Sequence, residues 1–134
     1  MSMEQQSNRE YVRTDNWSVN AKVSKDRDAE RWLPVEVPNI AAGGLLFLTD
    51  MVFNVGDELW VDMMIDPLTP GITGKIPMMV QGDITVDRGL VKGLHAYAVR
   101  FTVISHSERI RLDELIRITN YKGRLDEQAD IFDR

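Results

Sequence analysis

The chain has 134 residues, no cysteine, 43% hydrophobic and 28% charged residues, and a formal net charge of −5 at pH 7. This length fits one soluble domain, and the missing cysteines exclude a disulfide framework, a thiolate zinc site and a cysteine nucleophile. No apolar run approaches the ~18 residues of a membrane span, the N-terminus has no secretory signal, and the acidic balance disfavours DNA binding, so we expect a cytoplasmic protein that binds no DNA.

Six segments have the alternating apolar pattern of strands and are separated by turn signals. Pro34 and Pro38 predict a bulge or an edge in the second segment, because proline cannot donate to the ladder. Gly82 predicts a bend or a bulge in the fifth, and Asp87-Arg88-Gly89 predicts the turn that follows it. The expected strands cover residues 17–23, 32–40, 44–49, 59–65, 75–86 and 95–103.

A single helix is expected after the last strand. Ser105 and Glu108 have the spacing of a capping box, which satisfies free amide groups at a helix start. Apolar positions then recur at i, i+3, i+4 and i+7, and Gly123 is the expected stop. The stripe consists of Leu112, Leu115, Ile116 and Thr119. Strands at short intervals followed by one helix predict a small antiparallel barrel or sandwich closed by that helix.

No catalytic constellation is present in the sequence. There is no P-loop, no G-x-S-x-G elbow and no H-E-x-x-H pattern. The two histidines, His95 and His106, are too few for a histidine metal cage. We therefore expect a binding protein with neither a metal nor a cofactor, and not an enzyme.

Charge is distributed unevenly along the chain. The formal net charge is 0 over residues 1–31, −7 over residues 32–87 and +2 over residues 88–134. An anionic ligand is therefore expected to meet the N-terminal or the C-terminal part of the chain.

Two arginines, Arg9 and Arg13, precede the first expected strand. A guanidinium group pairs in a bidentate manner with phosphate oxygens or with guanine O6 and N7, and it stacks on bases. The same spacing recurs at Arg27 and Arg31, so the pattern alone is equally typical of solvated surface charge.

A second pattern, Asn39-Ile40-Ala41-Ala42-Gly43-Gly44, lies where one expected strand ends and the next begins. The Asn39 side chain offers both a donor and an acceptor to a base edge. Gly44 has no Cβ and allows a backbone or a ligand to approach closely. A plain bulge or hairpin turn explains the same residues.

Taken together, RxxxR before the first strand and this element about thirty residues later resemble the PilZ domain family, from about Arg9 to Tyr121. The resemblance implies a six-stranded antiparallel β-barrel with a C-terminal α-helix. It also implies binding of the second messenger cyclic di-GMP, with Arg9 and Arg13 clamping phosphates and guanine edges. The implied ligand-binding residues are Arg9, Arg13, Asn39, Ala41, Gly43 and Gly44.

The chain departs from the family pattern at Ala41, where relatives usually have serine. A lost hydrogen bond of this kind costs about 0.5–1.5 kcal/mol, or up to roughly tenfold in affinity. We expect a flexible lead-in over residues 1–13, a barrel with its helix over residues 14–123 and a tail over residues 124–134. The resemblance implies a nucleotide-gated switch acting on a partner in motility, pilus, secretion or exopolysaccharide machinery, and thus in biofilm signalling.

Two alternatives remain open from the sequence. A PilZ-like module can act through protein contacts without binding nucleotide, and the alanine at position 41 favours that alternative. An oligonucleotide-binding barrel has a similar pattern of strands, although the acidic middle of the chain disfavours it.

Overall fold

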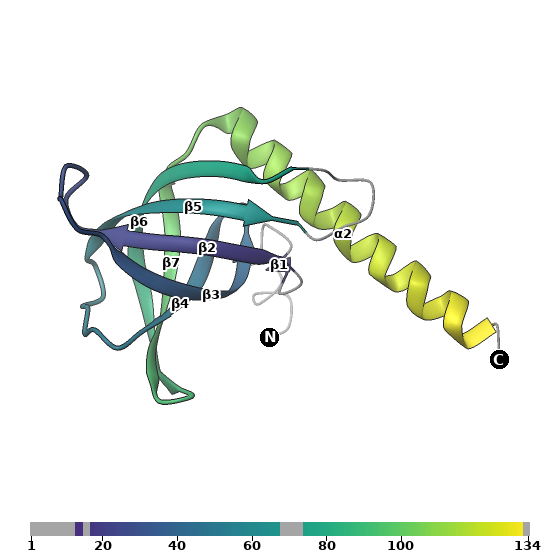
Figure 1. Cartoon of the computed structure of the whole chain (residues 1–134), viewed down its shortest axis with the longest axis horizontal. Helices are drawn as coiled ribbons and strands as arrows, with labels where there is room; N and C mark the ends of the chain where they lie inside the picture. The colour runs from purple at the N-terminus through teal and green to yellow at the C-terminus, as the bar shows by residue number, and fades with distance from the viewer. Residues whose placement is uncertain (1–12, 15–16, 68–73, 133–134) are drawn as a thin grey trace, which may run out of the picture.

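The structure is a computed structural model that describes residues 13–14, 17–67 and 74–132. It consists of a curled sheet and one long helix (Figure 1). The strands are β1 (Arg13–Thr14), β2 (Ser18–Ser24), β3 (Leu33–Ala41), β4 (Gly44–Thr49), β5 (Glu58–Asp66), β6 (Ile76–Val91) and β7 (Leu94–Val103), and the helix is α2 (His106–Phe132).

All strand pairs in the described residues are antiparallel, and the sheet closes on itself. The pairing runs β3–β2–β5–β6–β7–β4, and β4 pairs back with β3 to complete a barrel of six strands. The short strand β1 pairs with the end of β3, on the same edge that β2 uses further along. Closure leaves the barrel without a free sheet edge along most of its wall. The expected six-stranded barrel with a C-terminal helix is confirmed.

The core fills the barrel interior, where alternate residues of each strand turn inward. Adjacent methionines divide as this geometry requires, since Met63 and Met78 are buried while Met64 and Met79 are exposed. The largest fully buried side chains are Tyr97, Phe47, Ile40, Leu59, Met63, Ile65, Ile84, Leu112 and Ile116.

Helix α2 lies across one end of the barrel and extends beyond it (Figure 1). Leu112 and Ile116 are buried against the core, as the apolar stripe predicts. The indole Nε1 of Trp17 donates a hydrogen bond of 3.1 Å to Thr119 Oγ1, which ties the start of the barrel to the helix. At the helix start the backbone N–H of Glu108 donates to Ser105 Oγ at 3.1 Å, so the predicted cap is confirmed.

The loop between β4 and β5 is anchored at the opposite end of the barrel. The backbone N–H of Phe53 donates to the hydroxyl of Tyr97 at 2.9 Å. The backbone N–H of Asn54 donates to Asp57 Oδ2 at 2.9 Å, and Lys25 Nζ lies 3.2 Å from the same oxygen. These bonds fix the loop between β4 and β5 on the barrel.

The expected turn at Asp87-Arg88-Gly89 is wrong, because β6 continues to Val91. Gly89 instead accommodates an irregularity in the β6–β7 ladder with a φ of 76°. The hairpin turns at Lys92 and Gly93, whose φ angles of 53° and 79° are those of the two-residue turn that matches strand twist. The bend or bulge expected at Gly82 is confirmed as an irregularity of the β6–β7 ladder, whose register shifts between Gln81 and Gly82.

The expected helix end at Gly123 is also wrong, because α2 continues through this residue to Phe132. A single glycine costs a helix about 1 kcal/mol relative to alanine, which by itself is too little to end it. The segment that we expected as a C-terminal tail from residue 124 is therefore mostly helical.

Candidate functional site

The element from Asn39 to Gly44 forms the tight connection between β3 and β4. Ala41 pairs with Gly44 across the hairpin, and Ile40 pairs with Leu45. Ile40 is buried in the barrel, whereas Asn39 and Ala41 are half-buried. Because side chains alternate along a strand, Asn39 and Ala41 lie on the outer face of the wall.

Gly44 is required by the packing of strand β7. A Cβ at this position would overlap the carbonyl oxygen of Val99 and would lie 3.3 Å from Arg100 Cα. The neighbouring Gly43 accepts a hydrogen bond of 2.9 Å from the backbone N–H of Phe101. The two glycines thus fasten the turn onto the middle of β7. The close approach that we expected at Gly44 is made by the protein's own backbone.

Strand β1 brings Arg13, the second arginine of the N-terminal pattern, to this turn. Arg13 is paired with Ala41, and Thr14 is paired with Ile40. Thr14 is buried, as is its partner Ile40. Because side chains alternate along a strand, the next residue of β3, Ala41, lies on the outer face. Arg9 lies outside the described residues. The register therefore places the second arginine of RxxxR directly beside the motif at the end of β3.

The second arginine pair, Arg27 and Arg31, lies in the loop between β2 and β3. This loop follows the end of β2 that is remote from β1 (Figure 1). The guanidinium of Arg27 lies 5.3 Å from the ring centroid of Trp60, where it packs as a surface cation on an aromatic face. The fold thus separates Arg27 and Arg31 from Arg13, and of these three arginines only Arg13 adjoins the candidate site.

One row of cross-strand neighbours continues from this site around the barrel. Arg13 is paired with Ala41, Ala41 with Gly44, Gly44 with Arg100, and Arg100 with Asp83. Arg100 Nη2 lies 3.5 Å from Asp83 Oδ2, and 67% of the arginine side chain is exposed. Sequence reasoning missed Arg100. The alternation of side chains along β7 predicts that Arg100 points outward, but no local sequence pattern predicts that β7 lies beside β4.

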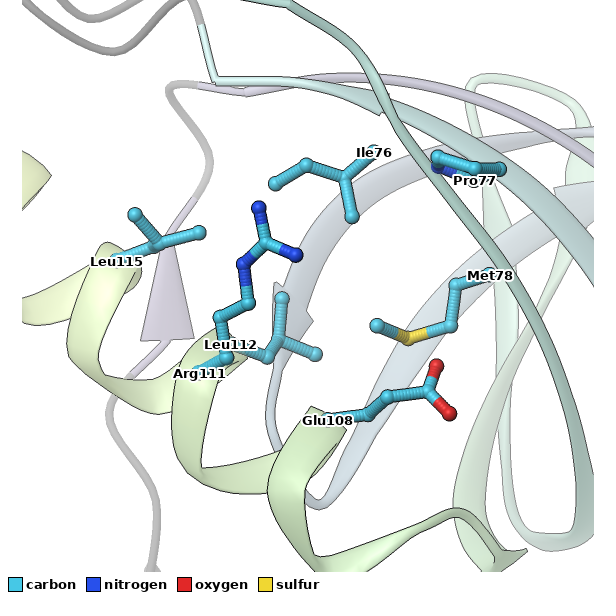
Figure 2. Close-up of a pocket in the computed structure, with 7 residues that line it drawn as sticks. All are labelled: Ile76, Pro77, Met78, Glu108, Arg111, Leu112 and Leu115. Carbon is cyan, nitrogen blue, oxygen red and sulfur yellow. The ribbon is translucent and has the colours of Figure 1, made fainter.

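A cavity of about 50 Å³ lies between the start of β6 and helix α2 (Figure 2). Figure 2 shows Glu108 and Arg111 on the helix beside an apolar lining. Sites for small molecules are usually about 300–1,000 Å³, so this cavity is too small for a nucleotide. Its lining consists of Ile76, Pro77, Met78, Glu108, Arg111, Leu112 and Leu115.

The described residues contain no group of three or more histidine, aspartate or glutamate side chains placed to hold a metal ion. Within the same residues, no helix combines the length and the apolar character that crossing a bilayer requires.

Comparison with known proteins identifies the family. The profile of the PilZ domain matches residues 7–117. The structure of the inhibitor of motility MotI/DgrA from Bacillus subtilis is similar, with a TM-score of 0.72, 17% identity, and coverage of 87% of this chain and 53% of that one. This chain therefore spans about half the length of MotI.

The PilZ domain of YcgR from Escherichia coli, solved with c-di-GMP, is also similar. It has a TM-score of 0.56 and 17% identity, and the match covers 91% of this chain and 97% of that one. YcgR in complex with c-di-GMP matches with the same TM-score and identity over 92% of this chain and 50% of that one. Among curated proteins, none matches this chain as a relative. The profile match covers most of the chain, and the chain belongs to the PilZ domain family.

Proposed function

We propose that this chain is a cytoplasmic receptor for cyclic di-GMP, which it binds on the outer barrel face where β1, β3 and β4 meet. The observation that carries the proposal is the register that sets Arg13 opposite Ala41 and Ala41 opposite Gly44. This register brings the backbone of Arg13, the second arginine of one pattern, beside Ala41 of the other pattern. The proposed contact residues are Arg9, Arg13, Asn39, Ala41, Gly43 and Gly44.

The chemistry of these residues suits a dianionic dinucleotide. Arg9 and Arg13 supply planar donor forks for phosphate oxygens and guanine edges. Asn39 supplies one donor group and one acceptor to a guanine. At position 41 a methyl group stands where a serine hydroxyl would donate, so we expect binding up to roughly tenfold weaker than with serine.

The comparisons support this ligand, since one of the similar structures is a PilZ domain with c-di-GMP bound. The local charge agrees with it, because no charged residue lies between Val37 and Thr49, the stretch that contains Asn39, Ala41, Gly43 and Gly44. An anion at the β3–β4 turn therefore meets no carboxylate of this stretch.

The proposed activity is signalling, not catalysis. A nucleotide held by both patterns joins the N-terminal segment to the end of β3 and changes the surface that a partner meets. The partner would belong to motility, pilus, secretion or exopolysaccharide machinery. The bound nucleotide is a ligand, and no metal or cofactor takes part.

Calorimetric titration with cyclic di-GMP tests the proposal on the wild-type chain, Arg13→Ala and Arg31→Ala. The last variant is a matched control, because it removes the corresponding arginine from the other RxxxR pattern. We expect micromolar or tighter binding, about −8 kcal/mol or better, for the wild type and Arg31→Ala. Arg13→Ala should bind at least tenfold more weakly, because it removes a charge-assisted contact. Equal binding by the two variants would contradict the assigned site.

The second candidate is a PilZ module that acts through protein contacts and binds no nucleotide. Ala41 favours it, and one similar structure is that of an inhibitor of motility. In that case a folded wild-type sample would give no heat with cyclic di-GMP, and its melting temperature would not respond to the nucleotide. An Ala41→Ser variant that gains binding would then show that the missing hydroxyl is the cause.

A further inference from the structure

We propose that Arg100 of β7 is an additional nucleotide-binding residue, which contacts an anionic oxygen of the ligand from the side opposite Arg13. The inference rests on the proposed function and adds a residue that belongs to neither of the two sequence patterns. Arg100 enters the site only through the closure of the barrel, because it is the cross-strand partner of Gly44.

The row of paired residues places the backbone of Arg13 at one end of a low surface and Arg100 at the other end. From Arg13 the row crosses Ala41 and Gly44 to reach Arg100. Strands lie about 4.8 Å apart, so these three steps separate the arginine Cα atoms by about 14 Å. Between them the outer surface carries one methyl group and one glycine. A ligand lying on this surface has Arg100 at one end and the backbone position of Arg13 at the other.

The backbone of β7 is held tightly at this point. Gly44 approaches it from β4, and a Cβ there would overlap the carbonyl oxygen of Val99. Gly82 approaches it from β6, where a Cβ would lie 2.6 Å from the carbonyl oxygen of Arg100. The Phe101 N–H to Gly43 O bond adds a third fixed point. The Cα of Arg100 therefore has a set position relative to the β3–β4 turn.

The side chain of Arg100 is available to a ligand. It is 67% exposed, and its ion pair with Asp83 is long, with 3.5 Å between Nη2 and Oδ2. An exposed pair of this kind contributes little, so its exchange for a phosphate contact is nearly free of cost. A phosphate oxygen offers the guanidinium a stronger, charge-assisted hydrogen bond.

The charged neighbours limit how far the ligand extends. Asp83 lies beyond Arg100 in the row, and the exposed Glu58 lies opposite Asp83 on β5. The helix contributes one further charged neighbour, Arg109 of α2. Its Nη2 donates a hydrogen bond of 3.3 Å to the carbonyl oxygen of Phe101 at a part-buried position. Two carboxylates thus repel an anion past Arg100, and the binding face ends at β7. An arginine contact here also offsets part of the hydroxyl contact missing at Ala41.

The test is a calorimetric titration of cyclic di-GMP into the full chain and the variants Arg100→Gln, Asp83→Asn and Arg88→Gln. Arg88 is an exposed arginine on the β6–β7 hairpin, and its loss changes the net charge equally. We expect Arg100→Gln to weaken binding by about tenfold or more. Arg88→Gln should bind like the wild type, and Asp83→Asn should bind at least as tightly. Arg100→Gln should melt at the wild-type temperature without ligand, because its side chain is exposed.

Failure of this inference is distinguishable from failure of the proposed function. If the wild type binds, Arg13→Ala does not, and Arg100→Gln binds like Arg88→Gln, the Arg100 contact is refuted while the receptor function stands. If the folded wild type does not bind, the function fails and the Arg100 contact fails with it. Equal weakening by Arg100→Gln and Arg88→Gln would also refute the contact, because it would show a general charge effect.

Discussion

Gly44 lies so close to the carbonyl group of Val99 that a side chain at position 44 would overlap it. The last glycine of the Asn39–Gly44 element therefore has a role in the fold, because it lets the start of β4 dock on β7. The same contact sets Arg100 beside the β3–β4 turn. A change at this glycine is thus expected to affect the barrel and the candidate site together.

Replacement of Gly44 by alanine should destabilise the protein by about 3 kcal/mol or more, which is the upper end of the usual cost of overpacking. The cost is high because the new methyl group would overlap backbone atoms, which cannot rotate away as a side chain can. Urea unfolding measures this, and calorimetry should show loss of cyclic di-GMP binding. Gly56→Ala is the control, since a Cβ there meets nothing within 4 Å and only its φ of 95° is strained. A Gly44→Ala variant with wild-type stability would show that β7 moves freely away from β4.

Replacement of Thr119 by valine should cost about 1–3 kcal/mol of unfolding free energy, because the buried Trp17 Nε1–H loses the hydroxyl oxygen that accepts its hydrogen bond. Valine keeps the shape of threonine, so the change isolates the hydroxyl. Thr102→Val is a suitable control, since the hydroxyl of Thr102 makes its bond of 3.3 Å at an exposed position. If both variants unfold at the same urea concentration, the indole bond does not tie α2 to the barrel.

The Asp57 carboxylate should give the protein a pH-dependent increment of stability. The hydrogen bond from the Asn54 backbone lowers the pKa of Asp57 below its ordinary value, and Lys25 acts in the same direction. A group with a lowered folded-state pKa stabilises the fold above its unfolded pKa of ~3.9, and this stability is lost as the pH falls through the folded-state pKa.

Asp57→Asn should therefore be less stable than the wild type at pH 7, and the difference should shrink below about pH 4. Urea midpoints of both proteins along a pH series measure this. A deficit that stays constant from neutral to acid pH would show that the charge of Asp57 contributes nothing.

Local patterns in the sequence predict the strands, the capped helix start and the fold class, because alternation and capping depend on neighbouring residues. They fail at two glycines, because glycine usually indicates a turn or the end of a helix and here it lies inside an element. Gly89 resembles a turn residue but lies in an irregular part of β6, and Gly123 resembles a stop but lies within α2.

The candidate site is only partly predictable for a different reason. Both short patterns are visible in the sequence, and they meet because β1 pairs with β3. Arg100 is more than fifty residues away from Gly44 along the chain, and their pairing exists only once β4 and β7 lie side by side. The sequence also does not predict why position 44 must be glycine, because Val99, whose carbonyl oxygen a Cβ would overlap, belongs to that distant strand.

Hydrogen–deuterium exchange with and without cyclic di-GMP tests the central claim most directly, because it locates the ligand on the barrel. We expect the nucleotide to slow exchange in β1, at residues 39–44 and around Arg100, and to leave the loop at residues 25–31 unchanged. Protection confined to other surfaces, or no protection at a concentration where calorimetry shows saturation, would contradict a binding face built from β1, β3, β4 and β7.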